Sequence, residues 1–172
     1  MLIVAATERE LAHVRSGETF VCGNGPVEAA ANTARRLAAG RPDAVLHVGI
    51  AGSRELAPLA VVLGSESVYT DLAAAIPVVN RLEPDARLYE RIRAALPDAV
   101  VAPIATSAAV GAGTGVEAME GFGVLRACAL AGVPAVELRV VSNSPDEPDR
   151  AKWRFEEAFA VLGATLDRLD VV

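Results

Sequence analysis

The sequence predicts an α/β layered fold in which strands alternate with helices. Short apolar runs bounded by glycine and proline are typical of buried strands, and Ala- and Leu-rich stretches with charged residues on one side are typical of helices. The two patterns alternate along the chain with no repeat and no linker between them. A length of 172 residues suits one domain that buries an adequate core.

The expected strands are short and apolar. They cover residues 2–6, 18–22, 44–48, 59–63, 66–69, 100–106 and 135–141. The strand over 44–48 ends in the glycine-bearing turn 49–52, and Gly64 separates the fourth strand from the fifth. Pro103 indicates a sheet edge or a bend in its strand, because proline cannot donate a hydrogen bond to a neighbouring strand.

The expected helices begin and end at residues that suit helix termini. They cover a short stretch after Thr7, with Leu11 and Val14 on its apolar face, and residues 27–39, 85–96, 119–131 and 149–169. Thr7 and Glu10 have the spacing of a capping box. Gly40 follows two arginines, which is typical of a helix C-terminus. Residues 108–115 are too uniformly small to assign.

Composition and charge exclude several classes of protein. No segment approaches ~18 uninterrupted apolar residues, so a membrane-spanning helix is not expected. A net charge of −6 with 4% aromatic residues argues against a nucleic-acid surface. The cysteines and histidines (Cys22, Cys128, His13 and His47) lack metal-ligand spacing, and no metal or organic cofactor is expected. The first ten residues lack the basic region of a secretory signal, so we expect a cytoplasmic protein that handles a small molecule.

Two glycine-bearing turns and an acidic pair are the candidate functional motifs. Residues 23–28 and 49–53 each follow an expected strand, and ligands of open α/β sheets bind at the carboxyl ends of strands. Glycines there let backbone N–H groups approach a ligand, although a tight turn or close packing is the alternative. Glu117 and Glu120 flank Met119 at a helix start. A carboxylate at that place can accept hydrogen bonds from a ribose diol, and a solvated charge pair is the alternative.

Several segments together carry a resemblance to a known family. They are Gly23-Asn24-Gly25-Pro26 with Ala29-Ala30, Gly49-Ile50-Ala51-Gly52, Val116-Glu117-Ala118-Met119-Glu120-Gly121 and Arg139-Val140-Val141-Ser142-Asn143. In these segments the chain resembles the nucleoside phosphorylase/nucleosidase family. Met119-Glu120-Gly121, Ser142-Asn143, Asp149-Arg150 and Trp153 are more similar to the futalosine hydrolases than to the methylthioadenosine/adenosylhomocysteine nucleosidases. The resemblance implies a three-layer α/β/α fold around a central mixed β-sheet, one domain over residues 1–172, and a homodimer or larger homo-oligomer.

For catalysis, the resemblance implies roles for Glu10, Arg139 and Asn143. Glu10 matches the glutamate that activates the attacking water, and Arg139 matches an arginine that helps to position that water. Hydrolysis of an N-glycosidic bond passes through a positively charged, oxocarbenium-like sugar, which a nearby carboxylate stabilises. Asn143 matches an aspartate of the adenine-specific nucleosidases. Because an amide can donate a hydrogen bond to N7 but no proton, Asn143 favours a 6-oxopurine as the leaving base.

For substrate binding, the resemblance implies Met119, Glu120, Gly52 and Ile50. Glu120 is expected to bind the ribose 2′ and 3′ hydroxyls, with Met119 packed against the sugar. An apolar Ile50 does not help to hold phosphate, which favours water as the attacking group. The expected partner is a purine nucleoside, with no nucleic acid and no membrane. No aromatic residue that could stack on the base lies between Tyr89 and Phe122.

The resemblance therefore implies phosphate-independent hydrolysis of futalosine to hypoxanthine, a step of menaquinone biosynthesis. The alternatives are a methylthioadenosine/adenosylhomocysteine nucleosidase, a phosphorylase and a non-catalytic nucleoside-binding protein. The residues also have structural alternatives. Glu10 is the acid of the predicted capping box, and Asn143 begins a good turn sequence. Arg139, which lies beside Glu137 in an apolar strand, can be exposed on an edge and pair on the surface. Trp153 is interpreted as a core or interface anchor.

Overall fold

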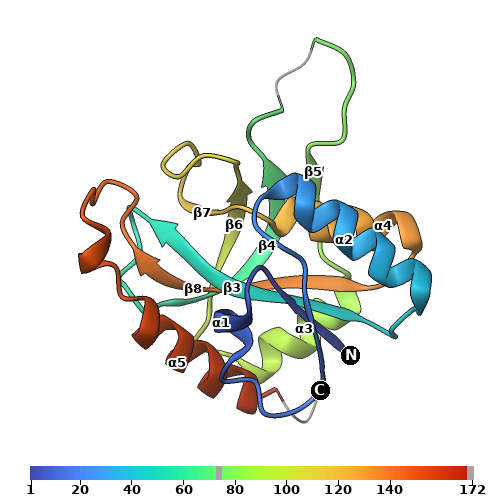
Figure 1. Cartoon of the computed structure of the whole chain (residues 1–172), viewed down its shortest axis with the longest axis horizontal. Coiled ribbons are helices and arrows are strands. Elements are labelled where there is room, and N and C mark those ends of the chain that lie inside the picture. The colour runs from blue at the N-terminus through green and yellow to red at the C-terminus, as the bar shows by residue number, and fades with distance from the viewer. Residues whose placement is uncertain (73–74, 170–172) are drawn as a thin grey trace.

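The computed structural model describes residues 1–72 and 75–169. Its strands are β1 (Leu2–Ala5), β2 (Glu18–Val21), β3 (Val45–Ser53), β4 (Val61–Tyr69), β5 (Arg81–Leu82), β6 (Val100–Thr106), β7 (Val116–Ala118) and β8 (Ala135–Asn143). Its helices are α1 (Glu8–Leu11), α2 (Pro26–Ala39), α3 (Ala86–Ala95), α4 (Gly121–Ala131) and α5 (Phe155–Asp167), with a 3-10 helix η1 (Arg150–Lys152) before α5. Strands and helices alternate along most of the chain, which confirms the predicted α/β class (Figure 1).

The strands form one mixed sheet that partly closes on itself. Its order is β2-β1-β3-β7-β6-β4-β5, and β8 pairs with both β3 and β4. Strands β1, β3 and β8 run parallel to one another, whereas β7 is antiparallel to β3 and β8 is antiparallel to β4. The ring of five strands formed in this way shares a buried cluster, to which each strand gives one residue: Ala51, Val62, Ile104, Val116 and Val141.

Helices cover both faces of the sheet, which confirms the three-layer arrangement. Helices α1, α3 and α5 lie on one side, and α2 and α4 lie on the other (Figure 1). Successive side chains of β1 point to opposite faces of the sheet, as they do along any strand, and so pack in the cores on its two sides. Ile3 joins the cluster of α3 and α5, whereas Leu2 and Val4 join the cluster of α2 and α4.

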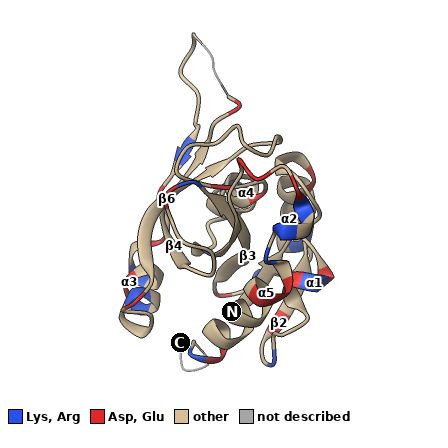
Figure 2. Cartoon of the chain, turned by 90° about the vertical axis from the view of Figure 1, so that its left-hand side faces the viewer, with Lys and Arg blue, Asp and Glu red and all other residues tan. Residues whose placement is uncertain are grey.

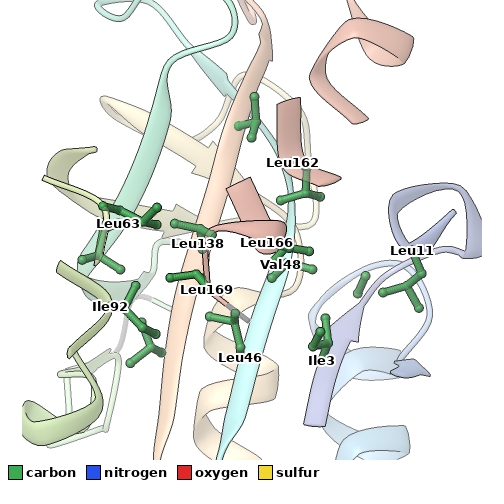
Figure 3. Packing of buried hydrophobic residues seen from close by; sticks show 14 of the residues in the cluster. Ile3, Leu11, Leu46, Val48, Leu63, Ile92, Leu138, Leu162, Leu166 and Leu169 are labelled. Atoms are coloured by element: carbon green, nitrogen blue, oxygen red, sulfur yellow. The ribbon is translucent and has the colours of Figure 1, made fainter. Parts of the chain in front are cut away.

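The larger cluster packs α3 and α5 against the middle of the sheet. Leu46, Val48 and Leu138 meet Leu162 of α5 and Ile92 of α3 there (Figure 3). Figure 2 shows that the charged residues lie mainly on the helices and loops, outside this core. Among the described residues, no helix has the length and apolar character needed to cross a bilayer.

Two of the expected strand interruptions are wrong. The predicted turn 49–52 is the second half of β3 and continues to pair with β8. A side chain on Gly49 would overlap the side chains of Glu10 and Arg139, so glycine there serves close packing. Gly64 likewise lies inside one continuous strand, β4, where the Ile104 side chain lies 3.0 Å from the place of a Cβ. Pro103 lies where the pairing of β6 with β4 shifts register. This agrees with the prediction, because proline cannot donate a hydrogen bond to a neighbouring strand.

Three expected helices have different bounds. The helix predicted over 149–169 is divided into η1 and α5, because the backbone of Trp153 is extended, with φ −74° and ψ 131°. The Trp153 indole donates to the Glu147 carbonyl at 3.0 Å, which fixes this bend. Helix α4 begins at Gly121 rather than at 119, since residues 116–118 are used for β7. Helix α1 ends at Leu11, so Val14 lies beyond it.

Candidate active site

The predicted site residues gather at the carboxyl ends of parallel strands. Glu10 lies just after β1, Ile50 and Gly52 lie in the second half of β3, and Asn143 ends β8. Because β1, β3 and β8 are parallel neighbours, these ends meet at one edge of the sheet. Ligands of α/β proteins bind at such an edge.

Two adjoining cavities form one cleft at this edge. The first, here the carboxylate compartment, has a volume of about 320 Å³ and is lined by Glu10 and Glu120 among others. The second, the amide compartment, has about 100 Å³ and is lined by Asn143 and Gly52. The two share the residues Ile50, Val110, Met119, Trp153 and Phe155. The cleft therefore brings together every predicted site residue except Arg139.

The Glu10 carboxylate is both a helix cap and part of the cleft wall. Its Oε2 accepts hydrogen bonds from the Thr7 backbone N–H at 3.0 Å and from the Thr7 hydroxyl at 2.9 Å, which confirms the capping box. Its Oε1 accepts from the backbone N–H of Ile50 at 3.1 Å. Glu10 is therefore both the acid of the helix cap and a residue of the cleft, and its hydrogen bonds in the cap fix the carboxylate in place.

Arg139 lies beneath the cleft floor and is completely buried. Its Nε donates to Glu137 Oε1 at 2.9 Å, and both side chains are buried, so the expected alternative of an exposed arginine that pairs on the surface is wrong. A Cβ on Gly49 would overlap both Arg139 Nη1 and Glu10 Oε1, which places these two atoms close to each other. Nη1 has no hydrogen-bond partner within the described part of the chain. Burial opposes the charge on Arg139, yet Glu137, Glu120 and Glu10 together raise the pKa of its guanidinium.

His47 supports Arg139 from below. Its Nδ1 lies 3.0 Å from the Val4 carbonyl oxygen, and its Nε2 contacts Arg139 Nη2. A carbonyl only accepts, so Nδ1 carries the proton and Nε2 accepts from the guanidinium. Burial, followed by the charge of Arg139, lowers the pKa of His47 well below its ordinary value. His47 is therefore a neutral acceptor that positions Arg139. No catalytic role was predicted for His47 from the sequence.

The acidic pair around Met119 is buried, so the solvated-pair alternative is wrong. Glu120 Oε1 accepts from the Gly25 backbone N–H at 2.9 Å, and burial raises the pKa of Glu120. The first glycine turn thus donates to a carboxylate of the protein itself. Both Glu117 oxygens accept from the loop before β7, from the backbone N–H groups of Gly111 and Gly113. Glu117 shapes the loop, and Glu120 faces the carboxylate compartment.

Asn143 presents an amide donor to the amide compartment. Its Oδ1 accepts from the Ser142 hydroxyl at 2.9 Å, which orients the side chain. Its Nδ2 donates no hydrogen bond to any atom of residues 1–72 and 75–169. The position of a Cβ on Gly52 would be 3.3 Å from this nitrogen. The predicted turn begins directly after Asn143, which is the last residue of β8. The side chain is thus a free donor at the end of a rigid strand.

An aromatic wall of the cleft was missed from the sequence. Trp153 and Phe155 meet edge to face with ring centroids 5.5 Å apart, and Phe155 stacks with Phe159 at 6.4 Å. All three rings line the carboxylate compartment. The chain has few aromatic residues, so their concentration between 153 and 159 was the available signal. In the described part of the chain, no group of His, Cys, Asp and Glu side chains is arranged to hold a metal ion.

Known proteins resemble this chain in sequence over short segments. The chain is 55% identical over 53 residues to a futalosine hydrolase of Streptomyces coelicolor, which is 31% of this chain and 23% of that protein. It is 42% identical over 57 residues to a futalosine hydrolase of Thermus thermophilus, which is 33% of this chain and 25% of that protein. The matched part of the chain thus spans about a quarter of the length of these curated relatives.

Solved structures and a family model match almost the whole chain. Futalosine hydrolase of Helicobacter pylori superposes with a TM-score of 0.87 at 18% identity, over 99% of this chain and 97% of that chain. A methylthioadenosine/adenosylhomocysteine nucleosidase of Neisseria meningitidis, in complex with methylthio-immucillin-A, gives a TM-score of 0.85 at 20% identity, over 98% and 96%. Such low identities establish the fold alone. The family model described as "Phosphorylase superfamily" matches residues 6–169, and the chain therefore belongs to that superfamily.

Proposed function

We propose that this protein is a purine nucleosidase that hydrolyses the N-glycosidic bond of futalosine and releases hypoxanthine. The observation that carries the proposal is the cleft itself, in which two buried carboxylates, Glu10 and Glu120, adjoin the amide of Asn143. The short segments shared with futalosine hydrolases support the choice of substrate. A place in menaquinone biosynthesis, a homodimeric or larger assembly and a cytoplasmic location belong to the same proposal.

In the proposed reaction, the ribose lies in the carboxylate compartment. Glu120 accepts hydrogen bonds from the ribose 2′ and 3′ hydroxyls, and Met119 packs against the sugar. Glu10 takes a proton from water as the water oxygen bonds to the sugar C1, and Arg139 Nη1 helps to orient that water. A positioned base of this kind typically contributes ~10²–10⁴-fold to the rate. The carboxylates also stabilise the positive charge of the oxocarbenium-like sugar.

The base leaves from the amide compartment. As the C1–N9 bond breaks, its electron pair goes to the purine, and Asn143 Nδ2 donates a hydrogen bond to N7. The purine anion then takes a proton from solvent water and leaves as hypoxanthine, and Glu10 returns its proton to solvent. An amide donates no proton, so the assistance suits hypoxanthine better than the poorer leaving group adenine. This difference favours a 6-oxopurine nucleoside over methylthioadenosine.

Water is the proposed attacking group. A phosphate dianion would meet the two buried carboxylates Glu10 and Glu120, and like charges repel more strongly at buried positions than in bulk water. The Arg139 guanidinium, which lies beneath Glu10, is already bonded to Glu137 and His47. Ile50 adds an apolar side chain and no hydroxyl at the same place. These features support hydrolysis over phosphorolysis.

Base release from futalosine, inosine and methylthioadenosine, followed by chromatography, tests the proposal. We expect hypoxanthine from futalosine, and a loss of at least about 100-fold in Glu10→Gln, since the amide is no general base. Glu8→Gln is the matched control, because Glu8 is an exposed residue of the same helix. Adenine release from methylthioadenosine alone would overturn the choice of substrate. A folded protein that releases no base would overturn the proposal as a whole.

A further inference from the structure

Glu137 is a buried carboxylate to which the proposed reaction gives no part. It is 1% exposed and lines neither compartment of the cleft. Its Oε1 accepts from Arg139 Nε, and its Oε2 has no hydrogen-bond partner among the residues that the structure describes. A buried ion pair adds little stability over a well-packed apolar pair of similar volume. The presence of this pair directly beneath the cleft therefore points to a role in the cleft.

The Glu137 carboxylate uses only one of the three guanidinium nitrogens of Arg139. A carboxylate often binds arginine through two parallel hydrogen bonds, which would use Nε together with one Nη nitrogen. Here Glu137 accepts from Nε, and Nη2 donates to the neutral His47. A planar group that is held at two of its nitrogens cannot turn without breaking one of these bonds. The direction of the third nitrogen, Nη1, is thereby fixed.

The fixed Nη1 lies beside the Glu10 carboxylate. A Cβ on Gly49 would overlap both Arg139 Nη1 and Glu10 Oε1, so the two atoms border the same small space. Within residues 1–72 and 75–169, Nη1 has no hydrogen-bond partner, and the ion pair of Arg139 is made with Glu137. Arg139 therefore presents a free donor next to the proposed base without being paired to it.

Glu137 is also the main counter-charge of the guanidinium. Burial opposes the charge on Arg139, and Glu137 has the largest effect among the carboxylates that raise its pKa. Glu120 and Glu10 follow in that order. Glu137 can lie here because Gly121, the first residue of α4, has no side chain: a Cβ there would overlap both carboxylate oxygens. Without Glu137, the carboxylates left around the guanidinium are those of the proposed reaction.

We propose that Glu137 is a positioning residue, which holds Arg139 so that Nη1 orients the attacking water and does not pair directly with Glu10. This inference rests on the proposed function, which makes Glu10 the general base. A direct pair would occupy the lone pair of Glu10 Oε1 that is free to accept from the water. Glu137 keeps the guanidinium on a carboxylate of its own and leaves that lone pair to the water.

Steady-state kinetics of hypoxanthine release from futalosine test the inference. For Glu137→Gln we expect kcat to fall at least about tenfold, because small misplacements of positioning groups have effects of this size. KM stays nearly unchanged, since Glu137 lines neither compartment. Ile92→Ala is the control for lost stability alone, because Ile92 is buried in the cluster of α3 and α5 and lines neither compartment. A rise in KM without a fall in kcat would overturn the inference, as would a kcat equal to that of Ile92→Ala.

A double-mutant cycle shows whether Glu137 acts through Arg139. Arg139→Met removes the group that Glu137 holds, so the added change Glu137→Met should lower kcat no further. The double variant leaves neither charge buried without its partner, which makes it a folded reference for the cycle. A second fall in kcat, as large as the fall in Glu137→Met alone, would show that Glu137 acts independently and would overturn the inference.

Nitrogen NMR of protein labelled in arginine gives a readout that does not depend on turnover. A guanidinium held at Nε and Nη2 shows separate signals for its two Nη groups, and those of Arg139 are missing from Arg139→Met/Glu137→Met. We expect these signals to broaden toward each other in Glu137→Gln, because the guanidinium rotates faster. Unchanged signals would overturn the inference. The expected broadening, in a protein that releases no base from any nucleoside, supports the hold on Arg139 and overturns the hydrolase proposal alone.

Discussion

The Glu10 carboxylate is bound by the backbone N–H of Ile50, which lies 40 residues further along the chain, at 3.1 Å. The other Glu10 oxygen is held by Thr7, so one side chain fastens the start of α1 to the middle of β3. A carboxylate oxygen has two lone pairs, and the Ile50 N–H uses one of those on Oε1. The second stays available to a water molecule in the cleft. The helix cap and the proposed general base are thus the same group.

Gly49→Ala should destabilise the protein and reduce base release. The new Cβ would overlap Glu10 Oε1, which accepts from the Ile50 N–H, and Arg139 Nη1, whose guanidinium is held through Nε by Glu137. Forcing a methyl group into a well-packed site costs about 1–3 kcal/mol of unfolding free energy. Urea denaturation measures the loss. Gly40→Ala is the control, since the nearest atom to its Cβ lies 3.7 Å away. Equal effects at both positions would contradict this account of Gly49.

Arg139→Met should cost about 3–5 kcal/mol of unfolding free energy, because it leaves Glu137 buried without its partner. The double variant Arg139→Met/Glu137→Met removes both charges, and we expect it to regain most of that stability but not the activity. Chemical denaturation and base release are measured on the same samples. A double variant as unstable as the single one would show that Glu137 is not the group left uncompensated.

The stability contributed at Glu120 should depend on pH in a defined direction. Burial raises the pKa of Glu120 above its ordinary 4.5, so the folded protein binds this proton more tightly than the unfolded chain does. The raised pKa lowers the free energy of unfolding only where Glu120 ionises. This loss of stability is absent below the pKa of Glu120 in the unfolded chain, and it grows as pH rises toward the pKa in the folded protein. Glu120→Gln should therefore raise Tm more at pH 7 than at pH 4. Its nucleoside binding falls, because an amide accepts less well from the ribose hydroxyls. A gain in Tm that does not change with pH would contradict the burial of a charge at this position.

Glu117→Gln should loosen the loop between β6 and β7. Both Glu117 oxygens accept from backbone N–H groups of that loop, those of Gly111 and Gly113, and an amide keeps only one acceptor. We expect hydrogen exchange at these two amides to accelerate by about tenfold, with the sheet amides unchanged. Glu55→Gln, at an exposed position, is the control. Unchanged exchange at residues 111 and 113 would refute the role of Glu117 as the loop anchor.

Much of the fold was predictable from local patterns. The capping box of α1 and the Gly40 end of α2 depend on neighbouring residues, and each lies where the pattern predicts it. The errors in the strands came from two glycines. Gly49 and Gly64 were interpreted as strand ends, but both lie within strands. They are glycines because side chains distant in sequence occupy the space that their Cβ atoms would need.

The site was predictable as a set of residues but not as an arrangement. Family order brought Glu10, Glu120 and Asn143 to one cleft, although nothing local shows that Arg139 lies beneath it rather than in it. The aromatic wall was missed because the long helix predicted over 149–169 hides the bend at Trp153. That bend brings Trp153 and Phe155 to the cleft, and it depends on the bond from the Trp153 indole to the Glu147 carbonyl.

The rate of hypoxanthine release from futalosine, measured in phosphate-free buffer and again with increasing phosphate, tests the central claim most directly. The proposed reaction predicts release at the same rate throughout, with the free modified ribose as the second product. Release that requires phosphate and yields a sugar 1-phosphate would contradict attack by water activated at Glu10. The absence of release by a folded protein would contradict the catalytic role of the whole cleft.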